Sequence, residues 1–112
     1  MSKLGTIDIA GKDGHVYSFK VYEWGTKFNQ VPGVYMVSRR SANGRTYSHE
    51  FIYVGETEDM SGRFSHHHRQ KCFDAKRKNA ICFHRCANAD ERLAIERNIR
   101  LKQDPPCNRE AT

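Results

Sequence analysis

The fold is decided by residues 33–55, which read GVYMVSRRSANGRTYSHEFIYVG. Two runs rich in strand-forming residues, 33–37 and 50–54, lie on either side of a polar segment. That segment contains Asn43-Gly44, a dipeptide typical of tight hairpin turns. The pattern predicts an antiparallel hairpin that turns near Asn43-Gly44 and ends at Gly55.

A second hairpin is predicted before this one. Ile7 and Ile9 alternate with polar residues, and a glycine-containing segment at 11–14 separates them from strand-forming residues at 16–22. Trp24 follows in an irregular crossing, where a large aromatic side chain is expected to anchor the core.

Three further elements are expected after the central hairpin. Helical spacing predicts a helix over 61–73, and a short apolar run predicts a strand over 80–86. Asn88, with Glu91 three residues later, forms the capping-box pattern of a helix that runs to about Lys102. Strands and helices in this order predict a single α+β domain over residues 1–112.

Composition narrows the function. The chain has 19 Lys and Arg against 13 Asp and Glu, a net charge of +6, which favours polyanionic partners. No apolar run approaches the ~18 residues of a membrane span, and the polar N-terminus lacks the features of a signal peptide. We therefore expect a cytoplasmic protein whose four cysteines are reduced thiols. These are Cys72, Cys82, Cys86 and Cys107.

Glu96 is the carboxylate most in need of explanation. It lies between Leu93 and Ile99 at three-residue spacing, on an apolar stripe of the expected last helix. A carboxylate there is desolvated unless it binds a cation or pairs with a basic residue. It is either a ligand of a hard metal ion or one half of an ion pair. The possible partners on the same helix are Arg92, Arg97 and Arg100.

Four other side chains are candidates for phosphate chemistry. Arg63 and His67 are four residues apart, so on a helix they would share a face and converge on one phosphate. The alternative is a solvated basic face. Tyr35 and Tyr53 lie in the two predicted strands, where a tyrosine is most often a packing residue.

Taken together, these residues resemble those of the GIY-YIG nuclease superfamily. Gly33-Val34-Tyr35 stands for the GIY motif and Tyr53-Val54-Gly55 for the YIG motif, each with Val in place of Ile. The resemblance covers residues 32–108 and leaves 1–31 as an N-terminal hairpin extension. It implies a small central antiparallel sheet flanked by helices. The six matching site positions are Tyr35, Tyr53, Arg63, His67, Glu96 and Asn108.

The resemblance also implies an activity, the metal-dependent endonucleolytic hydrolysis of DNA phosphodiester bonds. Glu96 would bind Mg²⁺ or Mn²⁺, Arg63 would stabilise the phosphoryl oxygens, and Asn108 would brace the site. Tyr35 would activate the attacking water, with the second tyrosine and His67 orienting it or relaying the proton. Because a phenol has an ordinary pKa of ~10, the sequence does not decide whether Tyr35 or His67 is the general base.

The two tyrosines place a condition on the hairpin. Side chains alternate between the faces of a strand, so a regular two-residue turn at Asn43-Gly44 would put Tyr35 and Tyr53 on opposite faces. Both can face one site only if the loop has an odd number of residues or a bulge shifts the register. We expect such an irregularity.

Other readings stay open. One is a non-catalytic nucleic-acid-binding or interaction module, and another is a hydrolase of small nucleotides or RNA. A zinc module built on Cys72, Cys82, His84 and Cys86 is disfavoured, because the sequence has no C-x-x-C pair. Glu56 stands where some superfamily members carry lysine, and an acid there either weakens phosphate attraction or adds a metal ligand.

Overall fold

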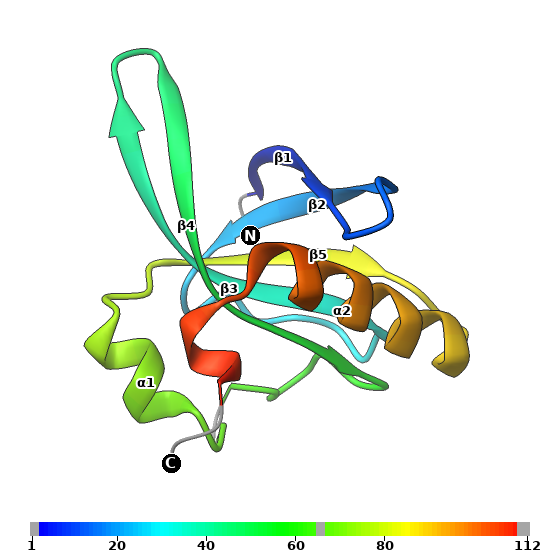
Figure 1. The fold of residues 1–112 in the computed structure, drawn as a ribbon. Coiled ribbons are helices and arrows are strands. Elements are labelled where there is room, and N and C mark those ends of the chain that lie inside the picture. Colours follow the sequence, from blue (N-terminus) through cyan, green and yellow to red (C-terminus); the bar gives the residue numbers. More distant parts are fainter. Residues whose placement is uncertain (1–2, 65–66, 110–112) are drawn as a thin grey trace.

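A computed structural model describes residues 3–64 and 67–109. One five-stranded antiparallel sheet, in the order β1-β2-β5-β3-β4, curls into a half-barrel (Figure 1). The elements in chain order are β1 (Lys3–Ala10), β2 (Val16–Glu23), β3 (Gly33–Asn43), β4 (Thr46–Thr57), α1 (Gln70–Ala75), β5 (Ala80–Arg85), α2 (Ala89–Gln103) and the 3₁₀ helix η1 (Pro106–Asn108).

The expected α+β arrangement, a small sheet flanked by helices, is wrong. The chain is mostly β, and within the described residues α2 is the only helix of seven or more residues. The helix expected over 61–73 accounts for the difference. Residues 61–64 form turns, Gly62 has the left-handed φ of 65°, and α1 begins only at Gln70. A left-handed residue cannot continue a right-handed helix, so the helical spacing of polar residues there was misleading.

The N-terminal hairpin is confirmed and belongs to the same sheet as the rest of the chain. β1 pairs with β2, and β2 pairs with β5 from Lys20↔Phe83 to Glu23↔Ala80. Trp24, just after β2, is partly buried, with its ring 5.0 Å from that of Phe64. The tryptophan thus packs as the expected anchor for this layer.

The last helix begins and ends close to the expected residues. The Asn88 side chain accepts a hydrogen bond from the Glu91 backbone N–H at 2.9 Å, which confirms the predicted cap. Helix α2 ends before Asp104, which has a left-handed φ of 45°. Its buried Ile99 packs on one face of the sheet with Phe19, Val34 and other apolar residues.

Strand β5 divides its side chains between the two faces of the sheet as predicted. Cys82 packs in the apolar cluster that includes Ile99 of α2. Ile81 and Phe83 pack in a second cluster with Tyr35. The second face is where the segment between β4 and α1 lies, and it carries most of the candidate site residues.

The central hairpin is longer than expected. β3 has 11 residues and β4 has 12, and β4 passes Gly55 and ends at Thr57, so the prediction that Gly55 ends the strand is wrong. The turn residues are Gly44 and Arg45, one position later than predicted, because Asn43 pairs with Thr46. Gly44 has a φ of 67°, which suits glycine in such a turn.

Two of the four cysteines are oxidised. A disulfide joins Cys72 in α1 to Cys107 in η1, so the prediction of reduced thiols is wrong for this pair. The sequence did not predict this pairing, because the two residues are 35 positions apart and meet only where α1 and η1 pack together. Cys82 and Cys86 are free and buried.

Among the helices of the described residues, none combines the length and the apolar character that crossing a membrane requires.

Candidate functional site

A β-bulge brings the two tyrosines to one face of the sheet. The β3–β4 register runs from Asn43↔Thr46 to Ser38↔Phe51 and then shifts, so that Val37 pairs with Tyr53 and Tyr35 with Gly55. Without this shift Tyr35 would lie opposite Val54, and Tyr53 would point to the other face. The ring centroids of Tyr35 and Tyr53 are 6.1 Å apart. The predicted irregularity is confirmed.

Gly55 makes room for the Tyr35 ring. A Cβ placed on Gly55 would lie 2.5 Å from Tyr35 Oη and 2.6 Å from Cζ, closer than real Cβ contacts. The glycine is therefore needed for close approach of the tyrosine to the backbone of β4.

Tyr35 is the buried centre of a hydrogen-bonded group. It has no exposed surface, and its hydroxyl lies 2.9 Å from His67 Nε2 and 3.1 Å from Arg63 Nε, which donates to it. Burial is the main cause that raises the pKa of Tyr35 well above its ordinary value, and the Arg63 guanidinium offsets part of this. Tyr35 is therefore a neutral phenol at neutral pH.

The hydrogen bonds of His67 define its tautomer. The backbone N–H of Arg69 donates to His67 Nδ1 at 3.1 Å, so Nδ1 carries no proton. Burial, followed by the charge of Arg63, lowers the pKa of His67 to about 4, so the ring is neutral at neutral pH and its proton is on Nε2. His67 Nε2 thus donates to Tyr35 Oη. In this arrangement His67 positions Tyr35 and has no free lone pair for a water.

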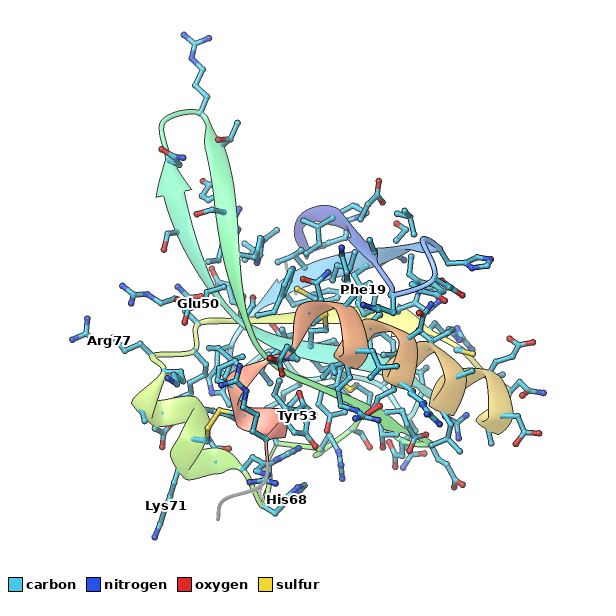
Figure 2. The ribbon with its side chains drawn as sticks, in the orientation of Figure 1. Phe19, Glu50, Tyr53, His68, Lys71 and Arg77 are labelled. Atoms are coloured by element: carbon cyan, nitrogen blue, oxygen red, sulfur yellow. A yellow bond between two sulfur atoms is a disulfide. The ribbon has the colours of Figure 1, made fainter. Side chains whose placement is uncertain are left out.

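Three of the six predicted site residues line one cavity of about 410 Å³. Tyr53, Arg63 and Glu96 all border it, so residues far apart in the sequence supply a phenol, a guanidinium and a carboxylate. Tyr35 and His67 do not border this cavity and lie buried behind Arg63. Figure 2 shows Tyr53, whose ring packs against those of His67 and Phe73, at the side of β4 near α1 and η1.

Glu96 forms the ion pair that the sequence offered as the alternative to metal binding. Arg100 Nε lies 3.0 Å from Glu96 Oε1 and 3.4 Å from Oε2, one turn along α2. The Glu96 side chain is 18% exposed and that of Arg100 is 41% exposed. This pair is partly solvated, and the carboxylate still borders the cavity.

Glu56 forms an ion pair with a different arginine. Arg92, whose side chain is 4% exposed, donates from Nε to Glu56 Oε1 at 3.0 Å, and its Nη1 donates to the carbonyl oxygens of Cys86 and Ala87. Glu56 also borders the cavity. The acid at this position therefore serves first as the partner of a buried cation, which would otherwise be uncompensated.

Asn108 braces the strand that carries Tyr53. Its Oδ1 accepts from the Val54 N–H at 2.8 Å, and its Nδ2 donates to the Val54 carbonyl oxygen at 2.9 Å. The amide therefore satisfies both backbone groups of Val54, as a neighbouring strand would. Its neighbour Cys107 is tied by the disulfide to α1, so this brace and α1 are covalently linked.

The oxygen donors that a hard cation could use in this cavity are two carboxylates, each of which is paired with an arginine. Glu96 and Glu56 supply carboxylate oxygens, and within the described residues no thiol or imidazole borders the cavity. Among residues 3–64 and 67–109, no group of three or more His, Cys, Asp or Glu side chains is placed to hold a metal ion. Mg²⁺ or Mn²⁺ here would take one or two carboxylates and complete its coordination with water and substrate oxygens, as Mg²⁺ commonly does.

Sequence reasoning did not assign their actual partners to two residues that shape this site. Arg92 was only one of three possible partners for Glu96, and nothing local showed that it turns to Glu56 instead. Arg100, also one of the three, is the actual partner. The i,i+4 spacing of Glu96 and Arg100 was the available signal, since such pairs are neighbours on a helix.

No family model, curated protein or solved structure matches this chain. The resemblance of its residues to those of GIY-YIG nucleases therefore stays a prediction.

Proposed function

We propose that this chain is an endonuclease of the GIY-YIG type, which hydrolyses DNA phosphodiester bonds with Mg²⁺ or Mn²⁺. One observation supports the proposal above the others: Tyr53, Arg63 and Glu96 border a single cavity. Phosphodiester hydrolysis needs a positioned water, a cation facing the phosphoryl oxygens and a site for a metal ion, and these three side chains suit those tasks.

Arg63 is suited to hold the scissile phosphate. Its Nε is anchored to the Tyr35 hydroxyl, and within the described part of the chain its two terminal nitrogens have no hydrogen-bond partner. A guanidinium fixed at one end and open at the other can present a fork to phosphate oxygens without first breaking an ion pair. Tyr35 and His67 act in this proposal as positioning residues for Arg63.

Tyr53 is the phenol that a water in the cavity would meet. Burial raises the pKa of Tyr53, Arg63 opposes that shift, and the charge of Glu96 adds to it. Neutralising the Glu96 charge would therefore bring the phenol closer to ionisation. A divalent ion held by Glu96 would stabilise charge on the phosphate and the leaving oxygen. This assignment moves the water-activating role from Tyr35 to Tyr53, because Tyr35 is fully buried.

A second candidate function rests on the Glu96–Arg100 pair. With Arg100 Nε within 3.4 Å of both carboxylate oxygens, Glu96 is already partnered without a metal ion. That arrangement favours the alternative of a non-catalytic nucleic-acid-binding module. The proposal also includes a cytoplasmic location, although disulfides such as Cys72–Cys107 are more usual in oxidising compartments.

Cleavage of supercoiled plasmid and of branched DNA, with Mg²⁺, Mn²⁺ or EDTA, tests the two candidates. We expect Glu96→Gln and Arg63→Ala each to lower the cleavage rate by about 10²-fold or more. Glu58→Gln is the matched control, because Glu58 is an exposed carboxylate in the loop after β4, and its rate should stay within about two-fold of wild type.

The possible outcomes distinguish the nuclease from the non-catalytic binding module. Cleavage that survives both site substitutions would reject the proposed site. Complete inactivity of the wild-type protein on every substrate, with DNA binding retained, would establish the binding module instead. If the Arg100 pair competes with the metal ion, Arg100→Gln should lower the Mg²⁺ concentration needed for half-maximal cleavage.

A further inference from the structure

The outer half of the β3–β4 hairpin projects beyond the rest of the sheet (Figure 1). β5 pairs with β3 only from Gly33 to Ser38, whereas β4 pairs with β3 as far as Asn43. We call residues 39–50 the arm. It is a two-stranded ribbon of five residue pairs, from Arg39↔Glu50 to Asn43↔Thr46, closed by the two-residue turn.

The two faces of the arm differ in composition. One face, here the polar face, contains only hydrogen-bonding side chains, and all of them are exposed. Residues directly opposite each other share a face, and residues two apart on a strand do as well. The polar face therefore consists of Arg39, Ser41, Asn43, Thr46, Ser48 and Glu50.

The opposite face of the arm is occupied by contacts within the protein. The Arg40 guanidinium lies over the Tyr47 ring, with Cζ 3.4 Å from its centroid, and the His49 and Phe51 rings stack. Arg40, Tyr47 and His49 also line a shallow cavity with residues of β1. This face is therefore turned toward β1, although Tyr47 is 55% exposed, whereas every side chain of the polar face is exposed.

The side chains of the polar face have few partners of their own. Thr46 Oγ1 donates to the Asn43 carbonyl oxygen at 3.0 Å, and within the described residues the other five side chains make no hydrogen bond or ion pair. A row of unsatisfied donors and acceptors on a projecting ribbon is solvated in the free protein and is available to another molecule.

These side-chain types match the edges of DNA bases. Arginine pairs with guanine, asparagine with adenine and glutamate with the cytosine amino group, and serine and threonine can contact any base. The arm also carries three arginines against one glutamate, so its charge favours a polyanion. A lipid surface or an apolar protein groove would not use this set, because no large apolar side chain lies on the polar face.

The dimensions suit the major groove of duplex DNA. That groove, about 12 Å wide, admits a two-stranded ribbon. Five residue pairs at ~3.4 Å each span about 17 Å, the axial length of about five base pairs. Glu50 at the base of the arm is three residues from Tyr53, or about 10 Å along β4, so the arm and the candidate active site fall within one turn of a duplex. Figure 2 labels both residues.

We propose that the arm enters the major groove of duplex DNA and reads base edges with its polar face. The proposal rests on the DNA substrate proposed above and makes it more specific: the substrate is double-stranded, and a sequence of about five base pairs lies within one helical turn of the cleaved bond.

Binding in EDTA tests the arm without any need for cleavage. The wild-type protein is used to select from a pool of 30-base-pair duplexes with a randomised centre, and affinities are then measured by fluorescence anisotropy. We expect one short motif to be enriched and to bind at least about tenfold more tightly than the starting pool. In Arg39→Ala and Asn43→Ala this preference should fall by about fivefold or more.

Lys12→Ala is the charge control, because Lys12 is an exposed cation in the turn between β1 and β2. It should weaken binding to the selected duplex and to the pool by the same small factor. Circular dichroism and the thermal midpoint should stay unchanged in all three variants, whose side chains are exposed.

Several results would overturn the arm proposal. They are an unenriched pool, equal effects of Arg39→Ala and Lys12→Ala on preference, and equal competition by single strands of the selected sequence. A protein that selects a motif but never cuts would keep the arm proposal and lose the nuclease proposal. A protein that cuts every duplex alike would keep the nuclease proposal and lose the arm proposal.

Discussion

Substituting Gly55 by alanine tests the packing that fixes the buried half of the site. The new Cβ would lie 2.5 Å from Tyr35 Oη, 2.6 Å from Cζ and 3.0 Å from Cε1. The Tyr35 ring must move, but it is fully buried and its hydroxyl is bonded to His67 and Arg63. Any shift of the ring therefore weakens one or both of these hydrogen bonds.

The expected cost follows from these two effects. Overpacking a well-filled core costs about 1–3 kcal/mol, and loss of a buried hydrogen bond adds about 1 kcal/mol. Gly55→Ala should therefore lower the free energy of unfolding by about 2–4 kcal/mol. For a domain of this size that corresponds to a thermal midpoint lower by about 8–17 °C. DNA cleavage should fall as well, because Arg63 loses its anchor on Tyr35.

Urea and thermal unfolding, followed by circular dichroism, measure this effect. Gly44→Asn is the control, because a Cβ at Gly44 meets no atom within 4 Å and asparagine tolerates its φ of 67°. Tyr35→Phe removes the hydroxyl that lies nearest the new Cβ. The double variant Tyr35→Phe/Gly55→Ala should therefore lose at least about 1 kcal/mol less than the sum of the single variants. A stability of Gly55→Ala within about 0.5 kcal/mol of wild type, or strict additivity, would refute the packing described here.

Three further predictions concern stability. The pKa of His67 is about 4 in the folded state and ~6.5 in the unfolded state, so the neutral ring contributes fully to the free energy of unfolding above pH 6.5. That contribution is lost as the pH falls toward 4. Urea unfolding from pH 4 to 8 should show a decrease of at most about 3 kcal/mol in the free energy of unfolding, and His67→Gln should abolish this decrease. Reducing the Cys72–Cys107 disulfide, whose residues are 35 positions apart, should cost about 3–4 kcal/mol, and a Cys72→Ser/Cys107→Ser protein should melt at one temperature with or without dithiothreitol. Asn108→Ala removes both bonds to Val54, so unfolding free energy should fall by about 1–3 kcal/mol and hydrogen exchange at the Val54 amide should accelerate; unchanged exchange there would show that Asn108 is not the brace.

Local sequence patterns predicted the parts of the fold that depend on neighbouring residues. The turn chemistry and alternating strands of both hairpins are local signals, and so is the cap of α2 at Asn88. The helix expected over 61–73 failed for the same reason. Helical spacing alone said nothing of the left-handed Gly62, nor of the packing that places Phe64 against Trp24.

In the candidate site, too, local sequence patterns predicted some features and tertiary packing decided the others. The alternation of strand side chains was enough to require a bulge if Tyr35 and Tyr53 were to share a face, and the structure has one after Val37. Four-residue spacing indicated both Arg92 and Arg100 as partners of Glu96, and only the tertiary structure shows that Arg92 pairs with Glu56 instead.

By itself, the sequence determined the strands, the turns, the capped helix and the order of the six candidate residues, because each of these depends on backbone propensity and side-chain periodicity within a few positions. Only the tertiary structure decided that Arg63 and Tyr35 are hydrogen-bonded, that Cys72 meets Cys107, and that Tyr53, Arg63 and Glu96 border one cavity. These contacts join residues that are 28 or more positions apart or lie on different elements, so they are set by how the sheet curls and which faces pack together.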